Sequence, residues 1–173
     1  MLAELVELAD SNTVDLVLVA GDVFVDVEEM AAAVEAGDHA RALDLYRGPF
    51  LAGGIQGVTR ELEGWIDGQQ ARVTRAHRQA RRGAIDGAVE AGELAAALGF
   101  ARGWVEMDPL DDEAQHRFIE LMGATGDRAG ALRQYDRYAA LVERELELEP
   151  LEETQSLVAR IREGEVGPRP GTG

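Results

Sequence analysis

The chain has 173 residues, enough for one well-packed domain, and it contains no cysteine. Disulfides, thiolate metal sites and cysteine nucleophiles are therefore excluded, and no apolar run is long enough for a membrane-spanning helix. Its 33 acidic residues outnumber its 17 basic residues and give a net charge of −16, which disfavours binding to phosphate backbones by this chain alone. The first ten residues hold no basic side chain, so we expect no signal peptide and a cytoplasmic protein.

The strongest β-strand pattern lies near the N-terminus. Apolar and β-branched residues alternate over residues 13–19 and resume at 23–25, on either side of Gly21-Asp22. This arrangement is typical of a short hairpin. We therefore predict β-structure only within residues 1–26, as a short hairpin.

From residue 27 onward the apolar spacing changes to that of amphipathic helices. Glycine, Gly-Asp or Asp-Pro pairs separate the helical stretches. The Gly/Pro-rich segment 164–173 is predicted to be a disordered tail, so the helical domain spans 27–163. Helices are expected over about 27–46 (divided at Gly37-Asp38), 60–90, 93–106, 111–124, 127–147 and 152–162.

One short motif occurs three times, each time between two predicted helices. It reads glycine, an acid, any residue, alanine, any residue, alanine and leucine, and its copies begin at Gly37, Gly92 and Gly126. The glycine can end one helix in a left-handed conformation, and the acid can cap the next helix. The second alanine lets two helices approach closely. These alanines are Ala42, Ala97 and Ala131.

The spacing of the motif predicts the fold class. The second and third copies are 34 residues apart, which is the period of TPR units. Pro109 falls where a TPR unit closes its second helix, whereas the third copy has Glu143 at that place and a helix that runs on toward Pro150. We predict an all-α fold of TPR-like helical-hairpin repeats, an α-solenoid, with the short N-terminal β-hairpin attached.

Further motifs carry a family resemblance. The most specific is Leu45-Tyr46-Arg47-Gly48-Pro49-Phe50-Leu51, and it is accompanied by Trp65, Asp108-Pro109-Leu110-Asp111-Asp112 and Leu146-Glu147-Leu148-Glu149-Pro150. With these motifs, residues 23–163 resemble the bacterial transcriptional activator domain, the TPR-like region of SARP-type and AfsR-type transcription regulators. In that family a winged-helix DNA-binding domain precedes the helical domain.

The resemblance implies a role in transcription regulation. It implies that residues 1–22 are the end of a winged-helix domain, whose recognition helix is missing from this chain, so that DNA would be bound only through the missing part. The helical domain would then self-associate or transmit a signal to a protein partner through its groove. A free-standing TPR-like adaptor unrelated to transcription is the alternative.

Five arginines on the long predicted helix form a basic strip in this acidic protein. Successive members are mostly three residues apart and therefore adjacent on the helix surface. The strip could dock an acidic partner surface or contact phosphate, or its members could pair with carboxylates of the same chain. The candidate partner-binding residues are Arg72, Arg75, Arg78, Arg81, Arg82, Tyr135 and Tyr138.

A cluster of glutamates lies near the C-terminus. It is either a solvated face or an electrostatic docking patch for a basic partner. Its members are Glu143, Glu145, Glu147, Glu149, Glu152 and Glu153.

We assign no catalytic, cofactor-binding or metal-binding residue and predict that the chain is not an enzyme. Gly21-Asp22 after an apolar run is similar to the metal-site strand of calcineurin-like metallophosphoesterases, but the histidine motifs of that site are missing. Glu113 and His116 have the spacing of di-iron bundles, which require a second such pair. His39 and His77 lie in charged surroundings, and we expect their side chains to be solvated.

Overall fold

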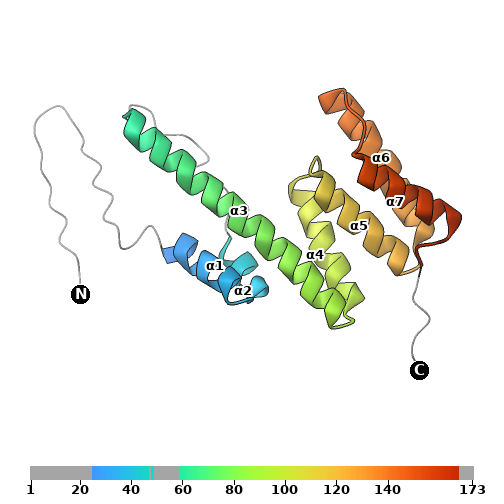
Figure 1. Cartoon of the computed structure of the whole chain (residues 1–173), viewed down its shortest axis with the longest axis horizontal. Helices are drawn as coiled ribbons and strands as arrows, with labels where there is room; N and C mark the ends of the chain where they lie inside the picture. The colour runs from blue at the N-terminus through green and yellow to red at the C-terminus, as the bar shows by residue number, and fades with distance from the viewer. Residues whose placement is uncertain (1–24, 47, 49–58, 168–173) are drawn as a thin grey trace, which may run out of the picture.

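The computed structural model describes residues 25–46, 48 and 59–167. Over these ranges the chain forms seven α-helices and no strand (Figure 1), which confirms the predicted all-α class. The hairpin predicted over 1–26 lies outside the described residues except for its end. There the prediction was wrong by two residues, because Val25 and Asp26 already belong to the first helix.

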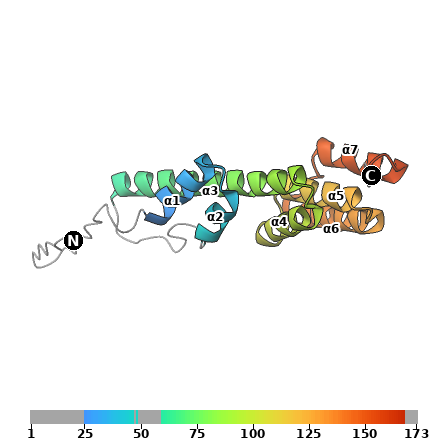
Figure 2. The same ribbon diagram turned by 90° about the horizontal axis from the view of Figure 1, so that it is seen from below.

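The helices are arranged as three hairpins and a final capping helix. α1 and α2 pack beside the middle of α3, and α4 to α7 gather at the C-terminal end of α3 (Figure 2). The final helix packs on both members of the third hairpin. The hairpins are α1 (Val25–Glu35) with α2 (His39–Leu45), α3 (Arg60–Glu90) with α4 (Leu94–Met107), and α5 (Asp112–Ala124) with α6 (Arg128–Leu146), and the capping helix is α7 (Glu152–Glu163).

The glycine-acid motif forms the turn inside each hairpin. Gly37, Gly92 and Gly126 have φ angles of 76°, 76° and 91°, the left-handed region that glycine enters without a steric penalty. In each copy the N–H of the acid donates to a carbonyl five residues earlier, at 2.9, 2.8 and 2.9 Å, and the glycine N–H donates to a carbonyl three residues earlier. These paired bonds form a Schellman motif. The three turns are therefore the same structure, as predicted.

The expected capping by the acid holds for two of the three copies. The Asp38 carboxylate accepts from Arg41 N at 3.1 Å, and the Asp127 carboxylate accepts from Gly130 N at 2.8 Å. Glu93 makes no such bond, because glutamate has one more methylene than the side chains that favour this position.

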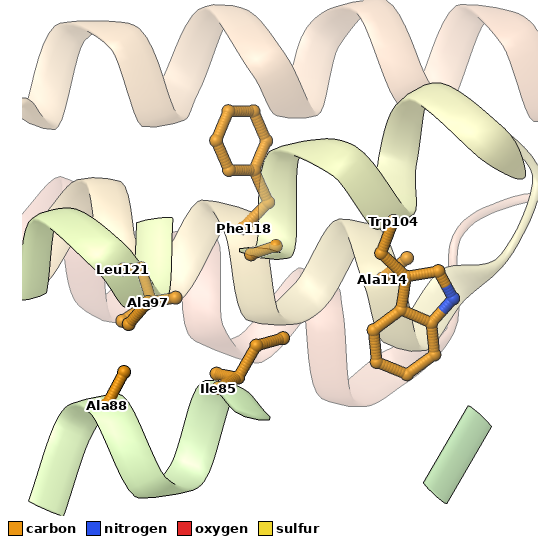
Figure 3. Close-up of a cluster of buried hydrophobic side chains, with 8 residues drawn as sticks. Ile85, Ala88, Ala97, Trp104, Ala114, Phe118 and Leu121 are labelled. Atoms are coloured by element: carbon orange, nitrogen blue, oxygen red, sulfur yellow. The ribbon is translucent and has the colours of Figure 1, made fainter. Parts of the chain in front are cut away.

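The second alanine of each motif is completely buried. Ala42, Ala97 and Ala131 are each 0 % exposed, and each belongs to a hydrophobic cluster that also includes the preceding helix. Figure 3 shows the cluster around Ala97, which Ile85 and Ala88 reach from α3 and Phe118 reaches from α5. One core therefore joins the second hairpin to the third.

Helix α3 serves two hairpins because it is 31 residues long. Ala80 packs in the α1–α2 cluster, and Ile85 packs in the α4–α5 cluster. Between them, a Cβ at Gly83 would collide with the His39 imidazole, so glycine is what lets α2 lie against α3 at this point. The expectation that His39 is solvated was wrong, because its ring packs on α3 and its Nδ1 atom is buried.

Helices α4 and α6 end within one residue of their predicted ends. α4 stops at Met107 before Asp108-Pro109, and α6 runs on to Leu146, after which Glu147 takes a left-handed φ of 56°. The beginning of the predicted disordered tail is ordered. Gly164 ends α7 in the same kind of turn, and Val166 packs on the cluster that contains Ile161. Residues 168–173 lie outside the described part.

The buried alanines generate the first prediction. We expect Ala97→Leu and Ala131→Leu each to lower the free energy of unfolding by about 1–3 kcal/mol, because a larger side chain must separate the helices or take a strained rotamer. Ala96 is exposed beside Ala97, so Ala96→Leu should change stability little and serves as the control. Urea denaturation of the three variants measures these effects. Equal behaviour of all three would show that the assigned helix contacts are incorrect.

Candidate protein-interaction surfaces

The basic strip of α3 divides into two parts, and one part is used inside the molecule. Arg78 Nη2 lies 2.9 Å from Asp111 Oδ2, at the N-terminus of α5. Arg82 donates through Nε and Nη2 to the two carboxylate oxygens of Glu113. For these two arginines, pairing within the chain is confirmed. Because both acids stand at the start of α5, the ion pairs connect α3 to the third hairpin.

Arg81 is also used internally, in a contact between α2, α3 and α4. Its Nε donates to His77 Nε2 at 3.1 Å, and its Nη2 lies 3.6 Å from Met107 Sδ. The Tyr46 ring stacks on His77 with centroids 3.7 Å apart. The expectation that His77 is solvated was wrong, since its side chain is buried under the Tyr46 ring at the end of α2. Burial, and then the positive charge of Arg81, lowers the pKa of His77 to about 4.

The other part of the strip remains open to solvent. Arg72 and Arg75 are exposed on the N-terminal half of α3, which stands apart from α4 to α7 (Figure 1). Arg72 donates only to the neighbouring Gln69, at 3.5 Å, and within the described ranges Arg75 has no ion pair. Residues one and two turns apart on this face line a shallow hollow of about 470 Å³. They are Asp67, Gln70, Ala71, Thr74, Arg75 and Arg78.

Tyr138, which was predicted to bind a partner, is instead part of the interior. Its side chain is 3 % exposed, and its hydroxyl donates to Asp112 Oδ1 at 2.9 Å. The same carboxylate accepts from Leu151 N at 3.2 Å and from Thr154 Oγ1 at 2.9 Å. Burial, followed by the bond to Asp112, raises the pKa of Tyr138 above its usual value. The tyrosine therefore holds α6 against α5 and α7 and is not available to a partner.

Tyr135 lies one turn earlier on α6 and does reach a hollow on the surface. This second hollow has a volume of about 380 Å³ and lies where α6, the α6–α7 connection and α7 meet. Arg162 of α7 covers part of the Tyr135 ring, with its guanidinium carbon 5.9 Å from the ring centroid. Two members of the predicted acidic cluster are in the lining, which consists of Tyr135, Ala139, Glu143, Leu148, Glu149, Pro150 and Gln155.

Three exposed leucines at this corner could not be identified from the sequence pattern. Leu146, Leu148 and Leu151 are 49 %, 59 % and 57 % exposed. Leu148 lines the hollow, and the other two lie close to it along the chain. The available signal was the alternation of leucine and glutamate through residues 145–149, which leaves apolar side chains with no helix to cover them. The pattern alone could not show that these leucines precede α7, which begins at Glu152, and stay exposed beside it.

The possible metal-site residues are engaged elsewhere. Glu113 pairs with Arg82, and His116 Nδ1 lies 3.1 Å from Thr154 Oγ1. The described ranges contain no group of three or more histidine, aspartate or glutamate side chains placed to share an ion. Among the helices described, none combines the length and apolar character needed to cross a membrane.

The buried His77 generates a prediction about pH. His77 takes up a proton near pH 6.5 in the unfolded chain and only near pH 4 in the folded protein. The contribution of neutral His77 to the free energy of unfolding is therefore complete above pH 6.5 and falls as the pH drops from 6.5 to 4. Between pH 7 and pH 5 the wild type should lose about 2 kcal/mol more than His77→Gln, which can still accept the bond from Arg81 but cannot ionise.

Denaturant titrations at both pH values check this difference. The carboxylates titrate in both proteins and cancel in the comparison. Parallel losses of stability in wild type and variant would show that His77 is not held neutral in the fold.

Comparison with known proteins agrees with this architecture. Residues 20–162 match the family model described as the bacterial transcriptional activator domain, which is a regulatory domain of bacterial transcriptional activators. No curated protein and no solved structure matches the chain. The family match covers more than half of the chain and includes every helix from α1 to α6 and nearly all of α7. The chain belongs to the bacterial transcriptional activator domain family.

Proposed function

We propose that this chain is the interaction and effector domain of a SARP/AfsR-type transcription regulator, and that it docks an acidic protein surface on the N-terminal half of α3. The observation that carries the proposal is the pair of exposed arginines on this helix, Arg72 and Arg75, of which Arg75 helps to line the hollow. In a chain of net charge −16, two exposed arginines that have no ion pair with a described residue stand out from their surroundings.

The division of the strip supports this assignment. Arg78, Arg81 and Arg82 have partners inside the molecule, so their presence is explained by the fold. With the residues that the structure describes, Arg72 and Arg75 form no ion pair, although they occupy the same helix and continue the same spacing. Exposed arginines with free guanidinium groups can form paired hydrogen bonds with a partner's carboxylates. A second copy of this acidic chain or another acidic protein would present such groups.

The shape of the helical array also suits a protein partner. Stacked hairpins expose helix faces over a long distance, which is how repeat proteins bind other proteins. The N-terminal half of α3 is one such face, and it continues directly into the part of α3 that the other hairpins bury. Reading of DNA sequence would belong to a winged-helix domain, since the negative charge of this chain opposes contact with phosphates.

The experiment compares two double variants of equal charge. In a strain lacking the gene for this chain, wild type should restore the transcripts that the deletion changed. Arg72→Glu/Arg75→Glu should reduce that restoration about tenfold, because reversed charges repel an acidic partner. Arg133→Glu/Arg160→Glu, two exposed arginines of α6 and α7, changes the net charge equally and should restore regulation normally.

Transcript profiling provides the measurement, and thermal unfolding of the purified variants confirms that each is folded. Full restoration by the α3 variant would contradict the proposal. So would an equal loss in both variants, because net charge and not the α3 face would then be responsible.

A further inference from the structure

The corner between α6 and α7 has an unusual combination of charge and apolar surface. Of the five large apolar side chains that are exposed within the described ranges, three lie in this short segment: Leu146, Leu148 and Leu151. A concentration of exposed apolar side chains rimmed by polar ones is typical of interaction sites. Here the rim is formed by glutamates, and the hollow of about 380 Å³ lies between them.

Glu143 and Glu145 lie in the last turn of α6, against the charge preference of that helix end. The C-terminus of a helix carries a partial negative charge and favours cations. The only basic residue in the last turn of α6 is Arg144, and its Nε lies 2.8 Å from Glu145. Glu143 and Glu149, which line the hollow, have no ion pair with any described residue. The negative end of α6 and the Glu143 carboxylate therefore add to one another, and a bound cation would relieve the repulsion. Glu149 brings a second carboxylate to the same hollow.

The walls of the hollow are already held in position. Gln155 Nε2 donates to Pro150 O at 2.7 Å, and Leu151 N donates to Asp112 at 3.2 Å. Glu147 N donates to Glu143 O at 3.1 Å, in the left-handed turn that ends α6. Little ordering of this segment is needed on binding, and a preformed surface gives higher affinity for the same contacts.

We propose that the α6–α7 corner docks an amphipathic, arginine-containing segment of a partner protein. An apolar side chain of the segment fills the hollow against Tyr135 and Leu148, and flanking guanidinium groups lie on Glu143 and Glu149. The leucines outside the hollow extend the contact beyond the size of a small molecule and favour a helical segment, which presents apolar residues along one face. This surface is separate from the α3 face and does not depend on the function proposed above.

The test uses a short fluorescein-labelled helical peptide, with leucines on one face and arginines beside them, and fluorescence anisotropy. Leu148→Ser and Glu149→Gln should each weaken its binding about tenfold, since each removes one central contact. Two matched controls on α3 alter an exposed apolar residue and an exposed glutamate. Val89→Ser and Glu90→Gln should leave the affinity within about twofold of wild type. A second peptide with serines in place of the leucines keeps the charge and should bind much more weakly.

Several results would overturn the proposal. Equal binding to all variants, or equal binding of the serine peptide, would mean that a cationic peptide is attracted by net charge alone. No binding of the leucine peptide to wild type would also overturn the proposal. If sedimentation shows that the wild-type chain self-associates and Leu148→Ser abolishes the association, then the occupant is a second copy and the proposed partner is wrong. The α3 variant Arg72→Glu/Arg75→Glu should bind the peptide normally, so failure of one proposal can be told from failure of the other.

Discussion

The close approach of two helices at a buried alanine is the contact on which the rest of this structure depends. In each hairpin a left-handed glycine reverses the chain, and the alanine five residues later has no exposed surface. Because methyl groups allow the helices to pack tightly, each hairpin becomes a compact unit with apolar faces on both sides. Those apolar faces are buried only against another helix. Helix α3 is long enough to pack against the first hairpin through one part of its length and to share a core with the third hairpin through another.

Polar contacts then fix how the hairpins are oriented. Asp112 receives hydrogen bonds from α6 and α7, and the buried Gln134 Nε2 donates to Gln115 Oε1 at 2.8 Å. Arg78 and Arg82 tie α3 to the start of the same helix, α5. Buried polar groups are costly when unpaired, so such contacts select one arrangement of the hairpins. Arg72 and Arg75 on α3, and Glu143 and Glu149 at the α6–α7 corner, form no ion pair with the residues that the structure describes, so these contacts leave them at the surface.

Local patterns predicted much of this fold because their causes are local. The glycines at 37, 92 and 126 mark their own turns, and the start of α3 after Thr59 and the end of α4 before Pro109 follow from capping and proline geometry. Tertiary contacts decided the rest. Tyr138 and His77 look like exposed side chains in the sequence, but Asp112 and Tyr46 meet them from other helices. Likewise, spacing identified the arginine strip but could not indicate that α5 begins beside Arg78 and Arg82.

Methyl NOE spectroscopy on the chain labelled at alanine, isoleucine and valine methyl groups tests the central claim most directly. Each buried alanine should show cross-peaks to the preceding helix of its own hairpin. These are Ala42 to Ala33 or Val34, Ala97 to Ile85 or Ala88, and Ala131 to Ile119. We expect such cross-peaks in all three hairpins and none from the exposed Ala96 to α3. Cross-peaks from Ala96, or none from Ala97 and Ala131, would contradict the arrangement of hairpins on which both proposed surfaces rest.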